Sequence, residues 1–153
     1  MSSRYPLEAA RKLRAQEVEE KKAELGAALA GVSAHEEKLE REKAALSEHQ
    51  ALRAKFRREE RGGGDGAELM RRVAYEQRLA SEERDKKQHV EDAQNELRNA
   101  ERAADAARAS LAQARAEAEA VEKHHQRWLA EQKQRAERAE EAEADDLASS
   151  RHS

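Results

Sequence analysis

The residues VEDAQNELRNAERAADAARASLAQARAEAEAVEKHHQRW, at positions 90–128, carry an apolar residue at every position of two interleaved heptad rows. The first row is Val90, Leu97, Ala104, Leu111 and Ala118, and the second is Ala93, Ala100, Ala107, Ala114, Val121 and Trp128. Two such rows form the narrow a/d seam of a coiled coil, which needs a second helix to cover it. The stretch therefore predicts one long helix and a partner for its seam.

The composition fits long helices better than a globular core. Of the 153 residues, 41% are charged and only 3% are aromatic, so bulky apolar surface is scarce. Richness in Ala, Glu, Lys, Leu and Arg with a heptad period is typical of coiled coils rather than of disordered chains. A net charge of −3 gives no reason to expect nucleic acid or a membrane surface as partner, and no apolar run is long enough to span a bilayer. We expect an all-α, cytoplasmic protein.

The partner helix is expected at the N-terminal side, from about residue 6 to 61. Pro6 suits a first helical turn. One heptad row is apolar: Val18, Leu25, Val32, Leu39 and Leu46. The second row is weaker, because the apolar residues Ala28 and Leu29 share its phase with the polar residues His35, Glu36, Glu42 and His49. We expect this helix to be held by its partner more than by its own propensity.

The glycine-rich residues 62–66 predict a loop between the two helices. A phosphate-binding loop is disfavoured, because the GK[ST] ending that reaches phosphate and magnesium is missing. Asp65 and Glu68 have the spacing of a helix N-cap and its partner, so a second helix is expected from about residue 67 to 147.

Two long helices with a short loop predict a single domain over residues 1–153, an antiparallel two-helix coiled-coil hairpin. A register in which paired residue numbers add up to 129 sets Leu39 against Val90 and Leu29 against Ala100, and brings Tyr5 beside His124. In that register the helix from about His125 onward has no partner in this chain. We therefore expect a C-terminal helical overhang.

The aromatic residues gather at the two ends of the expected hairpin, with Tyr5 and Trp128 at the termini and Phe56 and Tyr75 beside the loop. Two interpretations remain open: the rings plug the ends of the seam, or they anchor two docking surfaces. Basic residues cluster at the same ends, but glutamates dilute the cluster at the loop and no known nucleic-acid module is present. Nucleic acid is not expected as a partner.

No metal, cofactor or catalytic site is expected. His124 and His125 are adjacent and diverge on a helix, and neither has a ligand residue four positions away. His125 is interpreted as a polar seam residue that sets register. Cys is absent, and a two-helix hairpin offers no enclosed pocket where carboxylates could become an acid and a base, so we do not expect an enzyme.

Three segments resemble the FliJ/YscO family of type III secretion systems. They are the opening RYPLE at residues 4–8, the segment 69–79 with its single Tyr75, and the closing HHQRWLAEQKQRAERAEEAEADDLASSRH at residues 124–152. The resemblance covers the whole chain and favours the injectisome branch (YscO). The glycine-dense loop departs from the family pattern and leaves the contacts of this end open.

The resemblance implies a central stalk, similar to the γ-subunit hairpin of rotary ATPases, at the cytoplasmic side of the inner-membrane export apparatus and not inserted in the membrane. The paired termini would bind the hexameric secretion ATPase and the loop end would bind the export-gate protein, with secretion chaperones and a needle-length regulator as further partners. The residues expected to contact the ATPase are Arg4, Tyr5, Leu7, Arg11, Lys12, Arg14, Trp128 and Arg135. Those expected to contact the export gate are Leu52, Phe56, Val73, Tyr75 and Leu79.

Two alternatives remain. A holdase-type chaperone would clamp clients between helical arms, and a homo-oligomeric coiled-coil scaffold would associate through leftover apolar positions. The weak second row of the first helix leaves little apolar surface for self-association, which favours a monomer.

Overall fold

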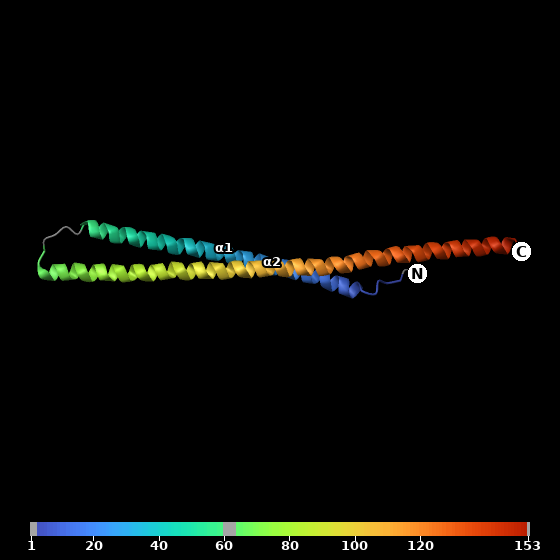
Figure 1. Ribbon diagram of the computed structural model, residues 1–153, viewed down its shortest axis with the longest axis horizontal. Helices are drawn as coiled ribbons and strands as arrows, with labels where there is room; N and C mark the ends of the chain where they lie inside the picture. The colour runs from blue at the N-terminus through green and yellow to red at the C-terminus, as the bar shows by residue number, and fades with distance from the viewer. Residues whose placement is uncertain (1–2, 60–63, 153) are drawn as a thin grey trace. The chain divides into compact units, whose positions relative to one another are not determined.

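The computed structural model describes residues 3–59 and 64–152. They form two helices, α1 at Glu8–Glu59 and α2 at Gly66–Arg151, and no strand is found among them (Figure 1). The helices pack against each other and run in opposite directions, since Tyr5 contacts His124 whereas Phe56 contacts Tyr75. The predicted all-α helical hairpin is confirmed.

The helix ends follow from local hydrogen bonds. Pro6 lies in the turn before α1, where the amide of Glu8 donates to the carbonyl of Tyr5 at 3.2 Å. Asp65 caps α2 as predicted, because its Oδ1 accepts a 2.8 Å hydrogen bond from the amide of Glu68. Of the expected loop at residues 62–66, Gly64 and Asp65 are not helical and Gly66 begins α2. Residues 62 and 63 lie outside the described part of the chain, as do residues 60 and 61, which were expected to end the first helix. At its other end α2 continues past the expected residue 147 to Arg151.

The chain divides into two compact units, each of which pairs a stretch of α1 with a stretch of α2. The terminal unit consists of Met1–Glu24 and Arg108–Ser153, and the loop unit consists of Leu25–Ala107. In the loop unit the two helices lie side by side, and in the terminal unit the start of the chain lies along α2 (Figure 1). The two sets of predicted contact residues therefore fall in different units.

The predicted seam of α2 is confirmed. Every member of its two heptad rows is buried or half-buried, and the covering is nearly complete at Ala93 and Ala104, which are 1% and 2% exposed. The apolar row of α1 is covered in the same way, with Leu39 at 8%. Alanine is small, so residues such as Leu39 fit between the two backbones without a wide separation.

The predicted position of Leu29 in the seam is wrong. Its side chain is 41% exposed, and Ala28 is the half-buried member of the row instead. The covered row follows heptad steps of mostly polar residues: Arg14, Lys21, Ala28, His35, Glu42, His49 and Phe56. The facing rows of α2 decide which residues of α1 are covered, so the larger apolar residue one step away stays in solvent.

The overhang begins later than predicted. Pairing was expected to end near His125, yet Ser3 Oγ donates to Gln132 Oε1 at 3.1 Å and Tyr5 contacts Trp128. The reason is that residues 3–5 are not helical, and a non-helical chain advances up to about 3.3 Å per residue, against about 1.5 Å in a helix. From Lys133 to His152 every residue is exposed, and Figure 1 shows this red end of α2 extending past the start of the chain.

In the described residues, neither helix contains a segment with the length and apolar character that crossing a membrane requires.

Candidate functional site

The terminal unit holds an aromatic cluster built around Tyr5. This side chain is only 7% exposed, and its hydroxyl shares a 2.6 Å hydrogen bond with His124 Nδ1. Its ring lies 4.6 Å from the ring of His125 and 5.3 Å from that of Trp128, the latter edge-on. Edge-on aromatic pairs of this kind stabilise a fold by more than the burial of their apolar area alone would. Tyr5 thus fixes the non-helical start of the chain to α2.

Two arginines fix the first turns of α1 to α2. Arg11 donates to Glu122 through Nε at 2.8 Å and Nη2 at 3.2 Å, and Arg14 Nη1 donates to Glu117 at 2.7 Å. The hydrogen bond from Arg11 holds the pKa of the Glu122 carboxyl below its ordinary value. Both arginines were predicted to contact the ATPase, and in the free chain they are engaged within the hairpin.

A groove of about 560 Å³ lies over the Tyr5 cluster. Its lining combines rings and charged groups: Arg4, Tyr5, Glu8, Lys12, His125 and Trp128. Four of the predicted ATPase-contact residues thus come together here, two of them exposed cations. Leu7 is 43% exposed, and Arg135 is exposed on the overhang. The nearly buried Tyr5 supports this surface from within.

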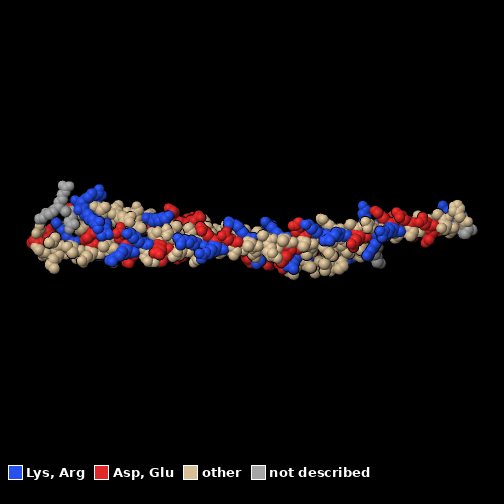
Figure 2. All heavy atoms as spheres, viewed as in Figure 1, with Lys and Arg blue, Asp and Glu red and all other residues tan. Residues whose placement is uncertain are grey.

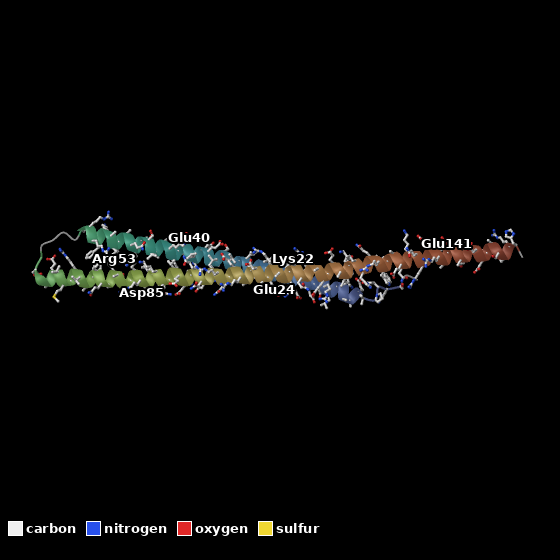
Figure 3. All side chains as sticks on the ribbon, in the orientation of Figure 1. Lys22, Glu24, Glu40, Arg53, Asp85 and Glu141 are labelled. Carbon is white, nitrogen blue, oxygen red and sulfur yellow. The ribbon has the colours of Figure 1, made fainter. Side chains whose placement is uncertain are left out.

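The overhang of α2 is a helix of almost purely polar surface. It ends in an acidic stretch that includes Glu140, Glu141, Glu143, Asp145 and Asp146. Figure 2 shows red atoms gathered over this part of α2, and Figure 3 shows Glu141 on a helix with no second helix beside it. An isolated helix without an apolar face is poorly stabilised in water, so this segment suits docking to another molecule.

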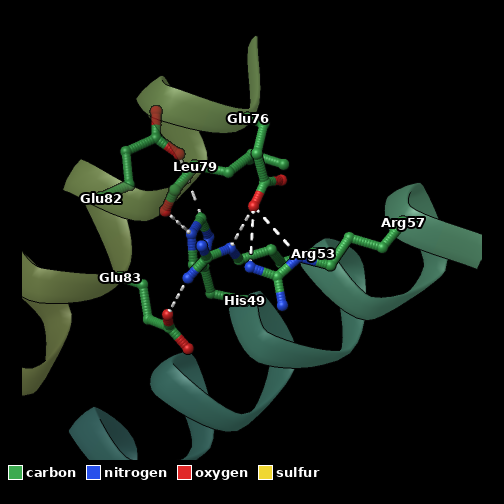
Figure 4. Close-up of polar contacts among 7 residues, drawn as sticks. All are labelled: His49, Arg53, Arg57, Glu76, Leu79, Glu82 and Glu83. Carbon is green, nitrogen blue, oxygen red and sulfur yellow. Dashed lines mark hydrogen bonds and ion pairs between the residues drawn. The ribbon is translucent and has the colours of Figure 1, made fainter. Parts of the chain in front are cut away.

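The loop unit holds a polar network close to the end of α1 (Figure 4). Arg53 Nε donates to Glu76 Oε1 at 2.9 Å, and its Nη1 donates to Glu83. Arg57 donates to the same oxygen of Glu76 through Nε at 3.1 Å and Nη2 at 2.9 Å. One carboxylate of α2 therefore holds two arginines from successive turns of α1.

These contacts shift the acidity of both glutamates. Burial alone raises the pKa of Glu76, but the hydrogen bonds from Arg53 and Arg57 outweigh it, and the pKa lies below its ordinary value. Burial likewise raises the pKa of Glu83, and the hydrogen bond from Arg53 with the charge of Lys87 again lowers it overall. Both groups are thus held as carboxylates at neutral pH.

Phe56 and Tyr75 meet at the loop end, edge-on with 4.7 Å between ring centroids. Arg78 lies over the Tyr75 ring at 5.7 Å, within cation–π range. The two rings line a shallow groove of about 340 Å³ together with Glu68, Arg71 and Arg72. Leu52 and Val73 are about half exposed, at 48% and 49%, whereas Leu79 is 1% exposed. Leu79 therefore supports the surface from within and offers it no side chain.

An apolar patch beside these rings contains two residues, Leu69 and Met70, that were not assigned a role from the sequence, whereas its third member, Val73, was expected to contact the export gate. Leu69 and Met70 are 59% and 74% exposed, and with Val73 they form the patch of the first turns of α2. The spacing of three and four residues that puts them on one face was visible. This exposed face was not recognised from the sequence, because the same spacing also fits a covered seam. Only the structure shows that nothing in the described residues covers these side chains.

Among the described residues no three side chains of His, Asp or Glu gather closely enough to hold a metal ion. The surfaces described in the terminal unit and in the loop unit consist of aromatic, cationic and apolar groups. Groups of these kinds suit the binding of protein partners.

A match to a protein family covers nearly the whole chain. The family described as YscO-like protein matches residues 2–153. No curated protein and no solved structure matches. The match spans both units and both candidate surfaces, and the chain belongs to the YscO-like family.

Proposed function

We propose that this chain is a central-stalk component of a type III secretion system, binding the hexameric secretion ATPase through the terminal unit and the export-gate protein through the loop unit. The family supports the secretion role in general. The assignment of partners to surfaces is our own. In this proposal the protein acts by binding and not by catalysis, at the cytoplasmic side of the export apparatus.

The observation that carries the ATPase assignment is the overhang. Residues 133–151 are the last part of α2 and are all exposed, adjoining the groove that Tyr5, Trp128 and exposed cations line. The central opening of a ring-shaped hexamer would supply the surface that this single helix lacks. Arg4, Leu7, Lys12, Trp128 and Arg135 are the residues we assign to direct contact. Tyr5, Arg11 and Arg14 would hold that surface in shape.

The export-gate assignment rests on the loop unit. Its exposed apolar groups, Leu52, Leu69, Met70 and Val73, surround the half-buried Phe56–Tyr75 pair. Arginines border the same region, and Figure 2 shows blue atoms gathered where α1 ends. Exposed apolar groups with a cationic rim favour a protein partner with an apolar, acidic surface. Secretion chaperones and the needle-length regulator are further candidate partners.

The proposal also holds that the free chain is a monomer. The apolar seams are covered inside the hairpin, and the exposed large apolar residues of the described chain are spread over both units: Leu7, Leu13, Leu29, Leu52, Leu69, Met70, Val73, Leu129 and Leu147. Light scattering should therefore give a mass near 17.3 kDa. A dimer or trimer would instead favour the homo-oligomeric scaffold, and capture of unfolded clients would favour the holdase.

The decisive test of the two-partner assignment is a pair of titrations. Purified secretion ATPase and the purified cytosolic part of the export gate are each titrated with the chain. We expect both to bind, and we expect saturating ATPase to leave gate binding intact because the surfaces lie in different units. Failure to bind either partner would contradict the assignment.

A further inference from the structure

Three cross-helix contacts in the loop unit form a regular ladder. His35 Nδ1 lies 3.6 Å from Glu96 Oε2, His89 Nδ1 lies 3.9 Å from Glu42 Oε2, and His49 Nδ1 lies 3.9 Å from Glu82 Oε2. Each contact is one heptad from the next along both helices, and the paired residue numbers add up to 131 in all three. The Phe56–Tyr75 pair stands one heptad further and has the same sum.

The rungs of this ladder alternate. Along α1 the order is His35, Glu42 and His49, whereas along α2 the facing residues are Glu96, His89 and Glu82. Each rung joins a histidine to a glutamate, and the histidine lies on α1 in the two outer rungs but on α2 in the middle one. Lys38 adds a 2.9 Å ion pair to Glu96 of the first rung.

The apolar seam and the ion pairs of Arg53 do not fix the register of the two helices. Heptad rows of Ala, Leu and Val superimpose on themselves after a slip of seven residues. The ion pairs of Arg53 do not distinguish these registers either. Glu76 and Glu83 stand one heptad apart, so one of them would remain beside Arg53 after a slip. A slip of one heptad moves the midpoint of the turn along the sequence by only about half a heptad. A small change in the residues at which the two helices end can accommodate this shift.

The ladder does distinguish these registers. A slip in one direction puts Glu42 opposite Glu96 and His49 opposite His89. The opposite slip puts His35 opposite His89 and Glu42 opposite Glu82. Every rung is lost in both cases and like groups face each other instead, and the facing carboxylates, Glu42 with Glu96 or Glu42 with Glu82, are unfavourable.

We propose that this alternating ladder is a register lock, which selects one pairing of α1 with α2 in the loop unit against the one-heptad slips that the apolar seam allows. Its consequence lies at the loop end. In either slipped register Phe56 would face a carboxylate, Glu68 or Glu82, in place of Tyr75. The lock therefore keeps the aromatic pair together whatever partner binds there. A polar group inside an apolar seam is a known way to specify register at some cost in stability.

The test uses the absence of Cys from this chain. Ser33 and Ser81 are both exposed in the loop unit, and Ser33→Cys with Ser81→Cys gives two sites for nitroxide labels. A slip of one heptad changes their separation along the helices by about 10 Å. Pulsed electron paramagnetic resonance, which measures the distance between the two labels, then reports the register.

The decisive variant exchanges one rung. Glu42→His with His89→Glu keeps the composition and all three rungs of the native register, but each one-heptad slip now retains two His–Glu pairs and creates no like pair. We expect a single distance in the labelled background and a second distance in this variant. Glu42→Gln with His89→Gln also removes the like pairs, and should show a second distance as well. Exchanging the exposed pair Glu40 and Lys43 of α1 is the control, and should leave one distance.

A single distance in both rung variants would overturn the proposal. So would loss of the helical circular dichroism signal in the exchanged variant, since that variant keeps every native rung. A second distance in the Glu40 and Lys43 control would contradict the proposal too, because the slipped register would then be populated although the ladder is intact.

Discussion

His49 on α1 donates a 2.8 Å hydrogen bond through Nε2 to the main-chain carbonyl oxygen of Leu79 on α2. The two side chains are 6% and 1% exposed, so this contact is among the most covered in the chain. A side chain of one helix thus binds the backbone of the other at the point where the apolar row of α1 gives way to polar residues.

Replacing His49 should destabilise the hairpin. His49→Ala removes a covered ring and its hydrogen bond, and we expect the free energy of unfolding to fall by about 1–2 kcal/mol. Urea unfolding followed by circular dichroism measures it. Ser47→Ala, at an exposed position nearby, is the control and should stay within about 0.5 kcal/mol of the original chain. Equal stability of the two variants would show that the His49 contact contributes nothing.

The Arg53 network should make the hairpin sensitive to acid. Glu76 and Glu83 have lowered pKa values in the folded chain, so the stability they contribute is present above their ordinary value of 4.5 and is lost as the pH falls through the lower folded pKa. Arg53→Met should lower stability at pH 7 and make this acid dependence shallower. Melting temperatures between pH 7 and about pH 3 test it.

The control for that series is Lys43→Met, because Lys43 pairs with Glu40 on the surface of α1. We expect its acid dependence to match that of the original chain. Parallel curves for Arg53→Met and the original chain would mean that Arg53 does not hold the two carboxylates in their charged form.

Two glycines inside α1 offer a gain in stability. A Cβ added at Gly26 or Gly31 would meet no atom within 4 Å, and both residues are helical. Alanine at each position should therefore raise the free energy of unfolding by about 0.5–1 kcal/mol, through the lower entropy of the unfolded chain and better helix propensity. Chemical unfolding of Gly26→Ala and Gly31→Ala checks this. Destabilisation by either alanine would indicate a crowding at α1 that the structure lacks.

Heptad periodicity predicted the covered rows of α2, because an unbroken apolar seam leaves few alternatives, and together with the glycine-rich residues 62–66 it predicted the hairpin. It could not place Leu29, since the covered row of α1 is set by the facing helix and not by the size of the residue. It also could not predict how far pairing reaches along α2, which depends on the non-helical course of residues 3–5. The sequence indicated that the aromatic residues gather near the termini and near the loop. The burial of Tyr5 and Leu79 and the exposure of Met70 are known only from the structure.

The apolar patch of α2 should carry the affinity for the export gate. Leu69→Ser, Met70→Ser and Val73→Ser together remove exposed apolar groups, so binding to the cytosolic part of the gate should weaken by about tenfold or more while the hairpin remains folded. Surface plasmon resonance measures the affinity and circular dichroism the fold. Leu29→Ser, at an exposed position elsewhere in the loop unit, is the matched control and should bind as the original chain does. Undiminished binding of the triple variant would assign the gate to another surface.

We expect the overhang beyond Gln132 to dock into the secretion ATPase. Residues 1–132 keep the Tyr5 cluster and the contact of Ser3 with Gln132, so this shorter chain should melt at nearly the same temperature as the full one. Calorimetric titration of the purified hexameric ATPase with both chains is the most direct measurement. We expect the shorter chain to bind the ATPase at least about tenfold more weakly, which is a loss of about 1.4 kcal/mol in binding free energy. Equal affinity of the two chains would contradict it.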